Sequence, residues 1–546
     1  MRKIFHQIGR FFFLALIIFA FTALTIFCAE KTDVLELAKH EFDLSVEPLP
    51  DGRLKLCWQK LPYPCLYKVE MFSETTGIVD GEPKPHLIFQ EFTVADFCEL
   101  PTTAIPLNYR VSAYGMFGKI SGPTPMIPNP DYPKPPHPVS IYKYNAENPA
   151  SLMPFLVWHV VPTAVCYELE ILSGLPDREG GVELSKINHL FDTRQIFTNG
   201  YQVDLRRWKN LGKVFWRARA LGLHHEPIGE FSPAEPLVFG EETPIPDRPL
   251  INDFDLMPGF SMPIYPVYEW IPLNTSKKYE VELLVKPPVM EHNTRPTPDR
   301  AWHMTVVNTG TCYDEYGRPY AGEYYWRVRA VDDNGNTVGT YSDTVKFVVK
   351  KPGRRILAAA FGDSITHGGG AVSYSPVSLE YSYTTFLDFP ALNLGRSGDT
   401  SRTTLERFSS DVLPFKPKNL LVLTGTNCLR DTEIKAEDVI ADIRGIKRNC
   451  ELAGIRPIFL TLMPINPQNI EYVFQTPTDP AWREKLDKIN SYIREQPYHI
   501  DLEPYFYDAT RTVLDYALSA DGLHPDLRGK MLMGEIINEH KNLLVR

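Results

Sequence analysis

The chain of 546 residues has few cysteines and no concentrated run of basic residues. Its eight cysteines include no Cys-x-x-Cys pair and no Cys/His cluster at zinc spacing, so a structural metal site is not expected. The formal net charge is −10, and binding to nucleic acid phosphates needs a concentrated basic face. We therefore expect no nucleic acid partner. Hydrophobic residues at 43% and charged residues at 23% are the proportions of a folded globular chain, which excludes extended disorder.

Three cysteines, Cys57, Cys65 and Cys98, lie close together in the sequence. They are near enough for one disulfide in an oxidising compartment. Small buried thiols are an equally good interpretation of the same residues.

The N-terminus has the pattern of an export signal. Three basic residues among the first ten precede an uncharged apolar run at residues 11–27. A basic segment followed by an apolar one is typical of signal peptides, and this run is just short of a comfortable membrane span. Residues 1–29 are therefore predicted to be a signal peptide or membrane anchor that is cleaved, retained or lipidated at Cys28. We expect an exported protein, located in the periplasm, at the cell surface or outside the cell.

An aromatic pattern recurs three times between residues 42 and 350. Each copy begins with a Trp and a Tyr nine residues apart: Trp58 and Tyr67, Trp158 and Tyr167, Trp270 and Tyr279. Some forty to fifty residues later each copy has a second aromatic segment with alternating apolar and polar residues, at 109–113, 216–220 and 326–330. Such alternation is typical of half-buried strands, and paired aromatic strands suit the facing sheets of a β-sandwich.

Units of this size with Gly, Pro and Ser turns resemble fibronectin type III or related immunoglobulin-like modules. The resemblance predicts three all-β sandwiches at residues 42–130, 139–243 and 250–350, with proline-rich linkers between them. Such modules serve as spacers or packing partners for another domain. Carbohydrate binding through exposed aromatic residues such as Tyr114 or Tyr320 is the alternative role.

From residue 354 onward, continuous apolar runs replace the alternation. Three runs have the composition of parallel strands buried on both faces: 355–361, 419–424 and 457–463. In residues 435–453 the apolar side chains recur every three or four positions, as on one face of a helix. Alternating strands and helices predict a three-layer α/β/α domain with a parallel sheet over residues 354–546. Ligands are then expected at the carboxyl ends of its strands.

Four short polar motifs occur in this region, after strand-like runs or at a helix entry. They are Gly362-Asp363-Ser364, residues 393–400 (Asn-Leu-Gly-Arg-Ser-Gly-Asp-Thr), Gly425-Thr426-Asn427 and Asp521-Gly522-Leu523-His524. Any one of them alone is common in proteins. All four in this order resemble the conserved blocks of the SGNH (GDSL-type) hydrolase family, and the resemblance covers residues 354–546.

The resemblance implies a serine esterase that needs no metal or cofactor. A serine hydroxyl becomes nucleophilic when a neighbouring base removes its proton, which gives Ser364 and His524 these roles. Asp521 would hold the imidazole in the correct tautomer. The oxyanion hole would consist of the backbone N–H groups of Ser364 and Gly398 and the side-chain amide of Asn427.

Two features depart from the family pattern. Cys428 stands where the family commonly has an aspartate, so the local hydrogen bonds must differ. A His-Gly-Gly-Gly segment at residues 367–370 follows the nucleophile, and no Gly-x-Ser-x-Gly turn surrounds Ser364. This segment is predicted to be a flexible loop, with His367 lining the substrate pocket.

These observations predict an exported serine esterase that releases a small acyl group, most readily acetyl, from a carbohydrate. A lipase or lysophospholipase is one alternative, although no long apolar insertion separates the motifs to form an acyl pocket. The other alternative is a non-catalytic glycan-binding or adhesion protein with a degenerate SGNH domain, which Cys428 keeps open. The expected partner is a small-molecule or polysaccharide ester, and residues 11–27 would provide any membrane attachment.

Overall fold

A computed structural model describes the chain in several stretches. These are residues 44–49, 54–61, 66–79, 82–100, 107–115, 118–121, 124, 127–128, 137–256, 260–349, 355–370, 376–378 and 381–545. The predicted signal or anchor segment, with Cys28, lies outside the described residues. Among the residues that are described, no helix is long and apolar enough to cross a membrane.

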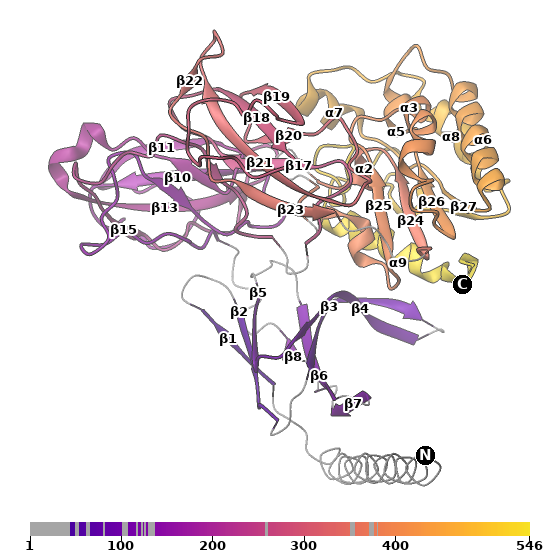
Figure 1. The fold of residues 1–546 in the computed structure, drawn as a ribbon, viewed down its shortest axis with the longest axis horizontal. Helices are drawn as coiled ribbons and strands as arrows, with labels where there is room; N and C mark the ends of the chain where they lie inside the picture. Colours follow the sequence, from indigo (N-terminus) through magenta and orange to yellow (C-terminus); the bar gives the residue numbers. More distant parts are fainter. Residues whose placement is uncertain are drawn as a thin grey trace, which may run out of the picture.

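The region from 44 to 349 is strand-rich, as the sequence predicts, and its antiparallel sheets are arranged in pairs (Figure 1). Module 1 denotes β1–β8. Its first sheet has the order β1 (Leu44–Pro48), β2 (Leu54–Trp58), β5 (Phe97–Leu100). Its second sheet has the order β4 (Glu82–Thr93), β3 (Leu66–Val79), β6 (Leu107–Gly115), β7 (Gly118–Ser121), and β8 (Ile127–Pro128) also pairs with β6.

Module 3 repeats this strand order in both sheets, and module 2 repeats it in its five-stranded sheet, whereas its first sheet has two strands. Module 2 denotes β9–β15, with one sheet of β12 (Gly200–Gln202) and β9 (Phe155–Val157). Its other sheet is β11 (His189–Ile196), β10 (Cys166–Leu172), β13 (Lys213–Leu221), β14 (Pro227–Ile228), with β15 (Glu235–Val238) on β13. A short 3-10 helix, η1 (Arg206–Leu211), precedes β13.

Module 3 denotes β16–β23. Its first sheet is β16 (Leu250–Ile251), β17 (Val267–Ile271), β20 (Thr311–Tyr313). Its second is β19 (Trp302–Val307), β18 (Lys278–Leu284), β21 (Gly322–Val331), β22 (Thr337–Val338), with β23 (Val345–Val349) on β21.

The recurring Trp and Tyr residues pack against each other inside each module. Their ring centroids are 5.4, 5.3 and 5.5 Å apart in modules 1, 2 and 3. Each Trp lies at or beside a strand of the first sheet and each Tyr lies on the second sheet, so the pair joins the two layers. The nine-residue spacing thus reflects the distance along the chain from one sheet to the facing one.

No disulfide joins Cys57 and Cys98, which are both free thiols. They lie on the paired strands β2 and β5, where Cys98 is opposite Leu56. Because neighbouring residues of a strand point to opposite faces, Cys57 and Cys98 face away from each other. Cys65 lies outside the described residues.

The C-terminal region contains the parallel sheet predicted from the sequence. Its order is β25 (Ala391–Gly395), β24 (Ala358–Gly362), β26 (Asn419–Leu423), β27 (Arg456–Leu460), β28 (His499–Ile500), and every pairing is parallel. The chain starts at β24, adds β25 on one side and then β26 on the other. The carboxyl ends of β24 and β26 are therefore the topological switch point at which ligands bind in such sheets.

Helices pack around this sheet in two contacting groups. The first includes α3 (Ser401–Glu406), α5 (Thr426–Arg430), α6 (Ala436–Ala453) and α8 (Trp482–Arg494). The second is α9 (Leu527–Glu539) with the 3-10 helices η3 (Tyr383–Phe386) and η5 (Lys541–Leu543). The remaining short elements are α2 (Ser364–His367), α4 (Phe408–Asp411), α7 (Pro467–Phe474) and η4 (Glu503–Tyr505).

The strand-rich modules pack against this C-terminal domain (Figure 1). Ile264 and Tyr265 of module 3 are buried within the hydrophobic core of the C-terminal domain. Val165 and Leu223 of module 2 form a small cluster with Val473 and Ala520. In module 1, β3 contacts α9 and β4 contacts η3.

Candidate active site

Ser364 lies at the point where β24 ends and α2 begins. Asp363 caps this helix, since its Oδ1 accepts the N–H of Ile365 at 3.1 Å. The preceding residue must be glycine, because a Cβ on Gly362 would lie 1.8 Å from the carbonyl oxygen of Leu423 on β26. The close approach of β24 and β26 therefore fixes the turn that holds the Ser364 hydroxyl at the carboxyl edge of the sheet.

His524 and Asp521 lie on the loop before α9, and this loop places them next to Ser364. The Ser364 Oγ is 2.9 Å from Nε2 of His524, and Nδ1 of His524 is 2.8 Å from Oδ2 of Asp521. The second oxygen of Asp521 accepts the N–H groups of Leu523 and His524, both at 2.8 Å. The structure thus brings these three sequence-predicted residues into one hydrogen-bonded chain.

Asp521 is completely buried, and it is held as a carboxylate. Burial alone would raise its pKa, but the charge of His524 and the hydrogen bonds from His524 and Leu523 keep that pKa below its ordinary value. A carboxylate at Oδ2 requires the proton on Nδ1 of His524. Nε2 then has a free lone pair directed at the Ser364 hydroxyl.

The predicted oxyanion donors lie around the same turn. Within the described part of the chain, the backbone N–H groups of Ser364 and Gly398 donate to no protein acceptor. Gly398 has φ of 85°, and a Cβ there would meet nothing within 4 Å, so its N–H lies at an open surface. Asn427 donates one amide hydrogen to the carbonyl of Asp399 at 2.9 Å, which leaves its second hydrogen for a ligand.

Hydrogen bonds join the loop that carries Gly398 to the Ser364 turn. The N–H of Arg396 donates to the carbonyl of Gly362 at 3.0 Å. The buried guanidinium of Arg407 donates to the carbonyls of Gly362 and Leu394, both at 2.7 Å, and to the carboxylate of Asp399. Sequence reasoning missed Arg407, because an arginine in the turn between two short helices, α3 and α4, carries no motif that marks it.

His367 does not line an open pocket, which corrects the expectation drawn from the sequence. Its side chain is 1% exposed, with Nε2 2.9 Å from the carbonyl oxygen of Tyr265. Its Nδ1 accepts the N–H of Ser397 at 3.2 Å and lies 3.0 Å from the Ser397 Oγ. Burial lowers the pKa of His367 to about 3, so the imidazole is neutral and carries its proton on Nε2.

Cys428, at the position where the resemblance led us to expect an aspartate, is a buried thiol that takes part in a polar chain. Its Sγ accepts the N–H of Ser401 at 3.4 Å, and the Ser401 hydroxyl donates to Oδ2 of Asp442 at 2.8 Å. Burial raises the pKa of the Cys428 thiol, which keeps it protonated. A carboxylate is thus present in this region, but it comes from α6 instead of the third motif.

Two further side chains form the rim beside His524. The Phe474 ring, at the end of α7, lies edge-on to the imidazole with a centroid separation of 6.0 Å. The Arg430 guanidinium lies 5.2 Å from the centroid of the same ring. Both residues were absent from the sequence interpretation, because neither belongs to one of the four motifs.

Lys530 on α9 is fully buried beneath the Ser364 turn. Its Nζ donates to the carbonyl oxygen of Ile365 at 2.6 Å. Burial lowers the pKa of Lys530 to about 7 and raises the pKa of Asp363 to about 6. Within the described residues, no group of three or more His, Cys, Asp or Glu side chains is arranged to hold a metal ion.

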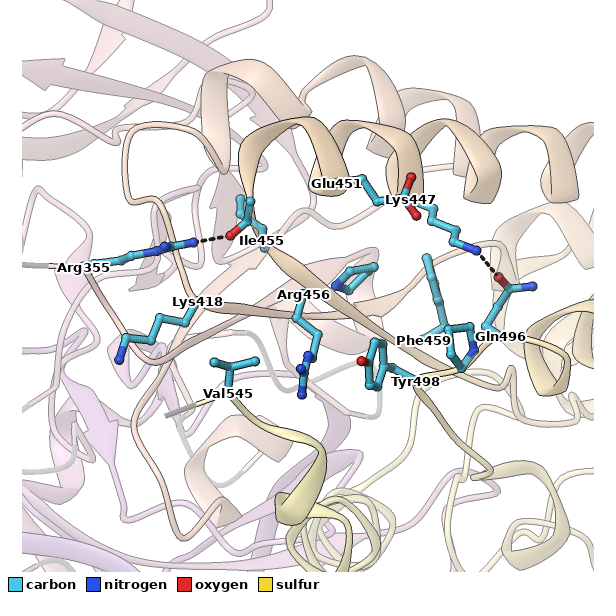
Figure 2. Close-up of a pocket in the computed structure, with 13 residues that line it drawn as sticks. Arg355, Lys418, Lys447, Glu451, Ile455, Arg456, Phe459, Gln496, Tyr498 and Val545 are labelled. Carbon is cyan, nitrogen blue, oxygen red and sulfur yellow. Dashed lines mark hydrogen bonds between the residues drawn. The ribbon is translucent and has the colours of Figure 1, made fainter.

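A cavity of about 410 Å³ lies at the other edge of the sheet, beside the amino ends of β26 and β27 (Figure 2). Basic side chains line it, namely Arg355, Lys418, Lys447 and Arg456. Ser364 and its partners lie at the carboxyl ends of the strands, so this cavity is separate from the candidate active site.

All four motifs lie within a single match to a protein-family model. Residues 360–532 match the model of the GDSL-like lipase/acylhydrolase family. A search of the curated proteins finds no match to this chain.

Among solved structures, a GDSL-like lipase from Bacteroides thetaiotaomicron is 19% identical, with a TM-score of 0.30; the alignment covers 36% of this chain and 92% of that one. A lipase/acylhydrolase from Enterococcus faecalis is 24% identical, with a TM-score of 0.28 and coverage of 35% and 98%. A catalytic mutant of an acetylxylan esterase from Geobacillus stearothermophilus is 18% identical, with a TM-score of 0.27 and coverage of 35% and 94%.

Proposed function

We propose, on the premise that residues 360–532 form a GDSL-like lipase/acylhydrolase domain, that this protein is an ester hydrolase with Ser364 as its nucleophile. The observation that carries the proposal is the unbroken hydrogen-bonded chain from the Ser364 hydroxyl through His524 to Asp521. A serine at a strand end acquires nucleophilic character only when such a base is within hydrogen-bond distance.

The reaction follows from the positions of these groups. Nε2 of His524 removes the proton of the Ser364 hydroxyl as Oγ attacks the ester carbonyl. The resulting oxyanion accepts hydrogen bonds from the N–H groups of Ser364 and Gly398 and from the Asn427 amide. His524 then donates the proton to the departing alcohol oxygen, which leaves an acyl group on Ser364. In the second half of the reaction His524 deprotonates a water molecule as it attacks the acyl carbonyl. The bond to Oγ then breaks, His524 returns the proton to Oγ, and the acyl group leaves as a carboxylic acid.

We further propose a small acyl group, such as acetyl, carried on a carbohydrate alcohol. Two side chains beside His524 support this choice, since the Phe474 ring contacts the imidazole and the Arg430 guanidinium lies over that ring. An aromatic face and a fixed hydrogen-bond donor suit a sugar ring, whereas a long acyl chain gains little from a guanidinium. Export through the N-terminal segment and fibronectin type III-like modules, inferred from the thrice-repeated sheet order, would place the domain where glycans occur.

Hydrolysis of p-nitrophenyl acetate by purified protein from residue 32 onward tests the proposal. We expect turnover by the native sequence, and we expect Ser364→Ala to lower kcat by about 10⁴-fold or more, because the nucleophile is gone. Equal rates in the two proteins would remove Ser364 from its role. Faster turnover of C8 and longer esters than of C2 esters would favour a lipase. No turnover of C2 to C12 esters or of acetylated glycans would favour a non-catalytic glycan-binding protein.

A further inference from the structure

A short segment of module 3 is built into the C-terminal domain beside the candidate active site. Residues 260–266 lead into β17, and Ile264 and Tyr265 in this segment are each 5% exposed. Both side chains belong to the hydrophobic core around the parallel sheet and not to the core of module 3. Module 3 thus supplies part of the interior on which the Ser364 turn rests.

Tyr265 makes hydrogen bonds at both ends. Its backbone carbonyl accepts Nε2–H of His367 at 2.9 Å, and its hydroxyl donates to Oδ2 of Asp411 at 2.7 Å. Two guanidinium groups lie near its ring, with the central carbon of Arg396 at 5.4 Å and that of Arg407 at 5.5 Å from the centroid. Such contacts of cations with a buried aromatic ring are attractive.

These bonds lead to the two residues that flank Gly398. On one side, His367 binds both the N–H and the hydroxyl of Ser397. On the other side, Asp411 accepts Nη1 of Arg407 at 2.9 Å, and Arg407 in turn holds the carboxylate of Asp399. Tyr265 is therefore the one residue that contacts both of these connections directly, among the residues that the structure describes.

We propose that Tyr265 is a positioning residue for the oxyanion-binding loop at residues 395–399. Module 3 would then help to fix the geometry of the esterase site. The inference rests on the proposed esterase function. An oxyanion donor is effective only when it is held at the place where charge develops, and a displacement of about 1 Å can cost up to about 10²-fold in rate. Within the described part of the chain the Gly398 N–H donates to no protein acceptor, so its position depends on how its two neighbours are held.

A matched control exists within module 3. Tyr268, on β17, is also fully buried, and its hydroxyl lies 3.0 Å from Oδ2 of Asp314, which pairs with Arg318. This Tyr–Asp–Arg arrangement has the same chemistry as that of Tyr265, Asp411 and Arg407. Among the described residues it makes no hydrogen bond to the loop at residues 395–399. The backbone N–H of Arg318 donates to the carbonyl of Ile264, a bond that loss of the Tyr268 hydroxyl does not remove. Tyr265→Phe and Tyr268→Phe therefore remove the same group in the same kind of surroundings.

The test compares these two variants with the native protein. We expect Tyr265→Phe to lower kcat on p-nitrophenyl acetate about tenfold with KM changed less than twofold, and Tyr268→Phe to leave both within twofold. Amide hydrogen exchange measured on peptides that span residues 394–400 should be several-fold faster in Tyr265→Phe and unchanged in Tyr268→Phe. Tyr265→Ala, which also removes the ring that the two guanidinium groups contact, should give a larger effect in both measurements.

The possible outcomes distinguish a positioning role of Tyr265 from a general loss of stability. Native kcat and native exchange in Tyr265→Phe would overturn it, as would equal losses in the two Phe variants, which would indicate a general loss of stability. If the native protein hydrolyses no ester, the esterase proposal fails. The exchange comparison then decides whether Tyr265 holds the loop, and unchanged exchange in Tyr265→Phe overturns the positioning role as well.

Discussion

Hydrogen-bond donors lie at both edges of the parallel sheet, but the two edges differ in whether these donors have protein partners. At the carboxyl edge, the N–H groups of Ser364 and Gly398 find no protein acceptor among the described residues, and the Asn427 amide uses only one of its hydrogens. At the amino edge, in the cavity of Figure 2, Arg355 donates to backbone carbonyls that include that of Gly454. Arg456 there donates to the carbonyl of Leu543 and lies over the Tyr498 ring.

The difference follows from the direction of the chain. Strands run from the amino edge to the carboxyl edge, where they lead into helices whose first N–H groups have no intrahelical partner. Helices return to the amino edge with their unpaired carbonyl groups, as α6 does at Gly454, and these satisfy the guanidinium donors. The carboxyl edge therefore keeps free donors for a ligand, whereas at the amino edge Arg355 and Arg456 donate to carbonyl groups of the protein itself.

Among the substitutions at the two edges, Asn427→Ala should cause the largest loss of kcat. Removal of one oxyanion donor typically costs about 10²- to 10³-fold in kcat, and the side chain lies at the carboxyl edge with a hydrogen to spare. Steady-state kinetics on p-nitrophenyl acetate would measure the change. A rise in KM with kcat unchanged would show that Asn427 contributes to binding alone and would contradict its proposed place in the oxyanion hole.

The buried imidazole of His367 should make stability at the carboxyl edge sensitive to acid. Its folded-state pKa of about 3 lies below the ordinary value of 6.5, so between these values the unfolded chain binds a proton that the folded protein does not. The free energy of unfolding should therefore decrease as pH falls from about 6.5 toward 3, by up to about 1.4 kcal/mol per pH unit from this group.

Chemical denaturation between pH 7 and pH 4.5 checks this effect. His367→Gln cannot titrate there, so its unfolding free energy should depend less steeply on pH than that of the native protein. Other acid-sensitive groups, such as Asp521, contribute equally to both proteins and cancel in the comparison. Parallel pH profiles for the two proteins would mean that His367 is not kept neutral by its surroundings.

Cys428→Ala should change kcat by less than about fivefold. The thiol contacts Ser401, while Asn427 is held separately by the Asp399 carbonyl, so loss of one weak sulfur hydrogen bond should leave the oxyanion donors in place. Kinetics beside Cys428→Ser, which keeps a polar group of similar size, would separate packing from hydrogen bonding. A loss as large as that of Asn427→Ala would show that the thiol supports the donor directly.

Lys418→Ala, at the amino edge, should have the smallest effect. Its side chain lines the cavity of Figure 2 at the end of the sheet away from Ser364, so kcat and KM should stay within twofold of the native values. The same p-nitrophenyl acetate assay provides the comparison. A tenfold loss of kcat would show that the two edges are coupled and that the division drawn between them is wrong.

Much of this architecture could be predicted from local sequence patterns. The apolar runs at 355–361, 419–424 and 457–463 correspond to β24, β26 and β27, because a strand buried on both faces needs apolar residues throughout. The three- and four-residue spacing in 435–453 corresponds to α6, Ala436–Ala453. The alternation of apolar and polar residues likewise predicted the strands of the modules. Their Trp and Tyr pairs join facing sheets.

The sequence by itself determined which chemical groups stand at the strand ends. The four motifs contain the residue types that ester hydrolysis by a serine would require, at fixed local positions. Only the tertiary structure decided how those groups are held. His367 is buried because a segment of module 3 covers it, and its partner there is the carbonyl of Tyr265, a group that every residue possesses and no sequence pattern marks. Arg407 and Asp442 likewise act through contacts with segments that are distant in the sequence, at Gly362 and Ser401. Local periodicity encodes strands and helices, whereas these contacts depend on how whole modules pack.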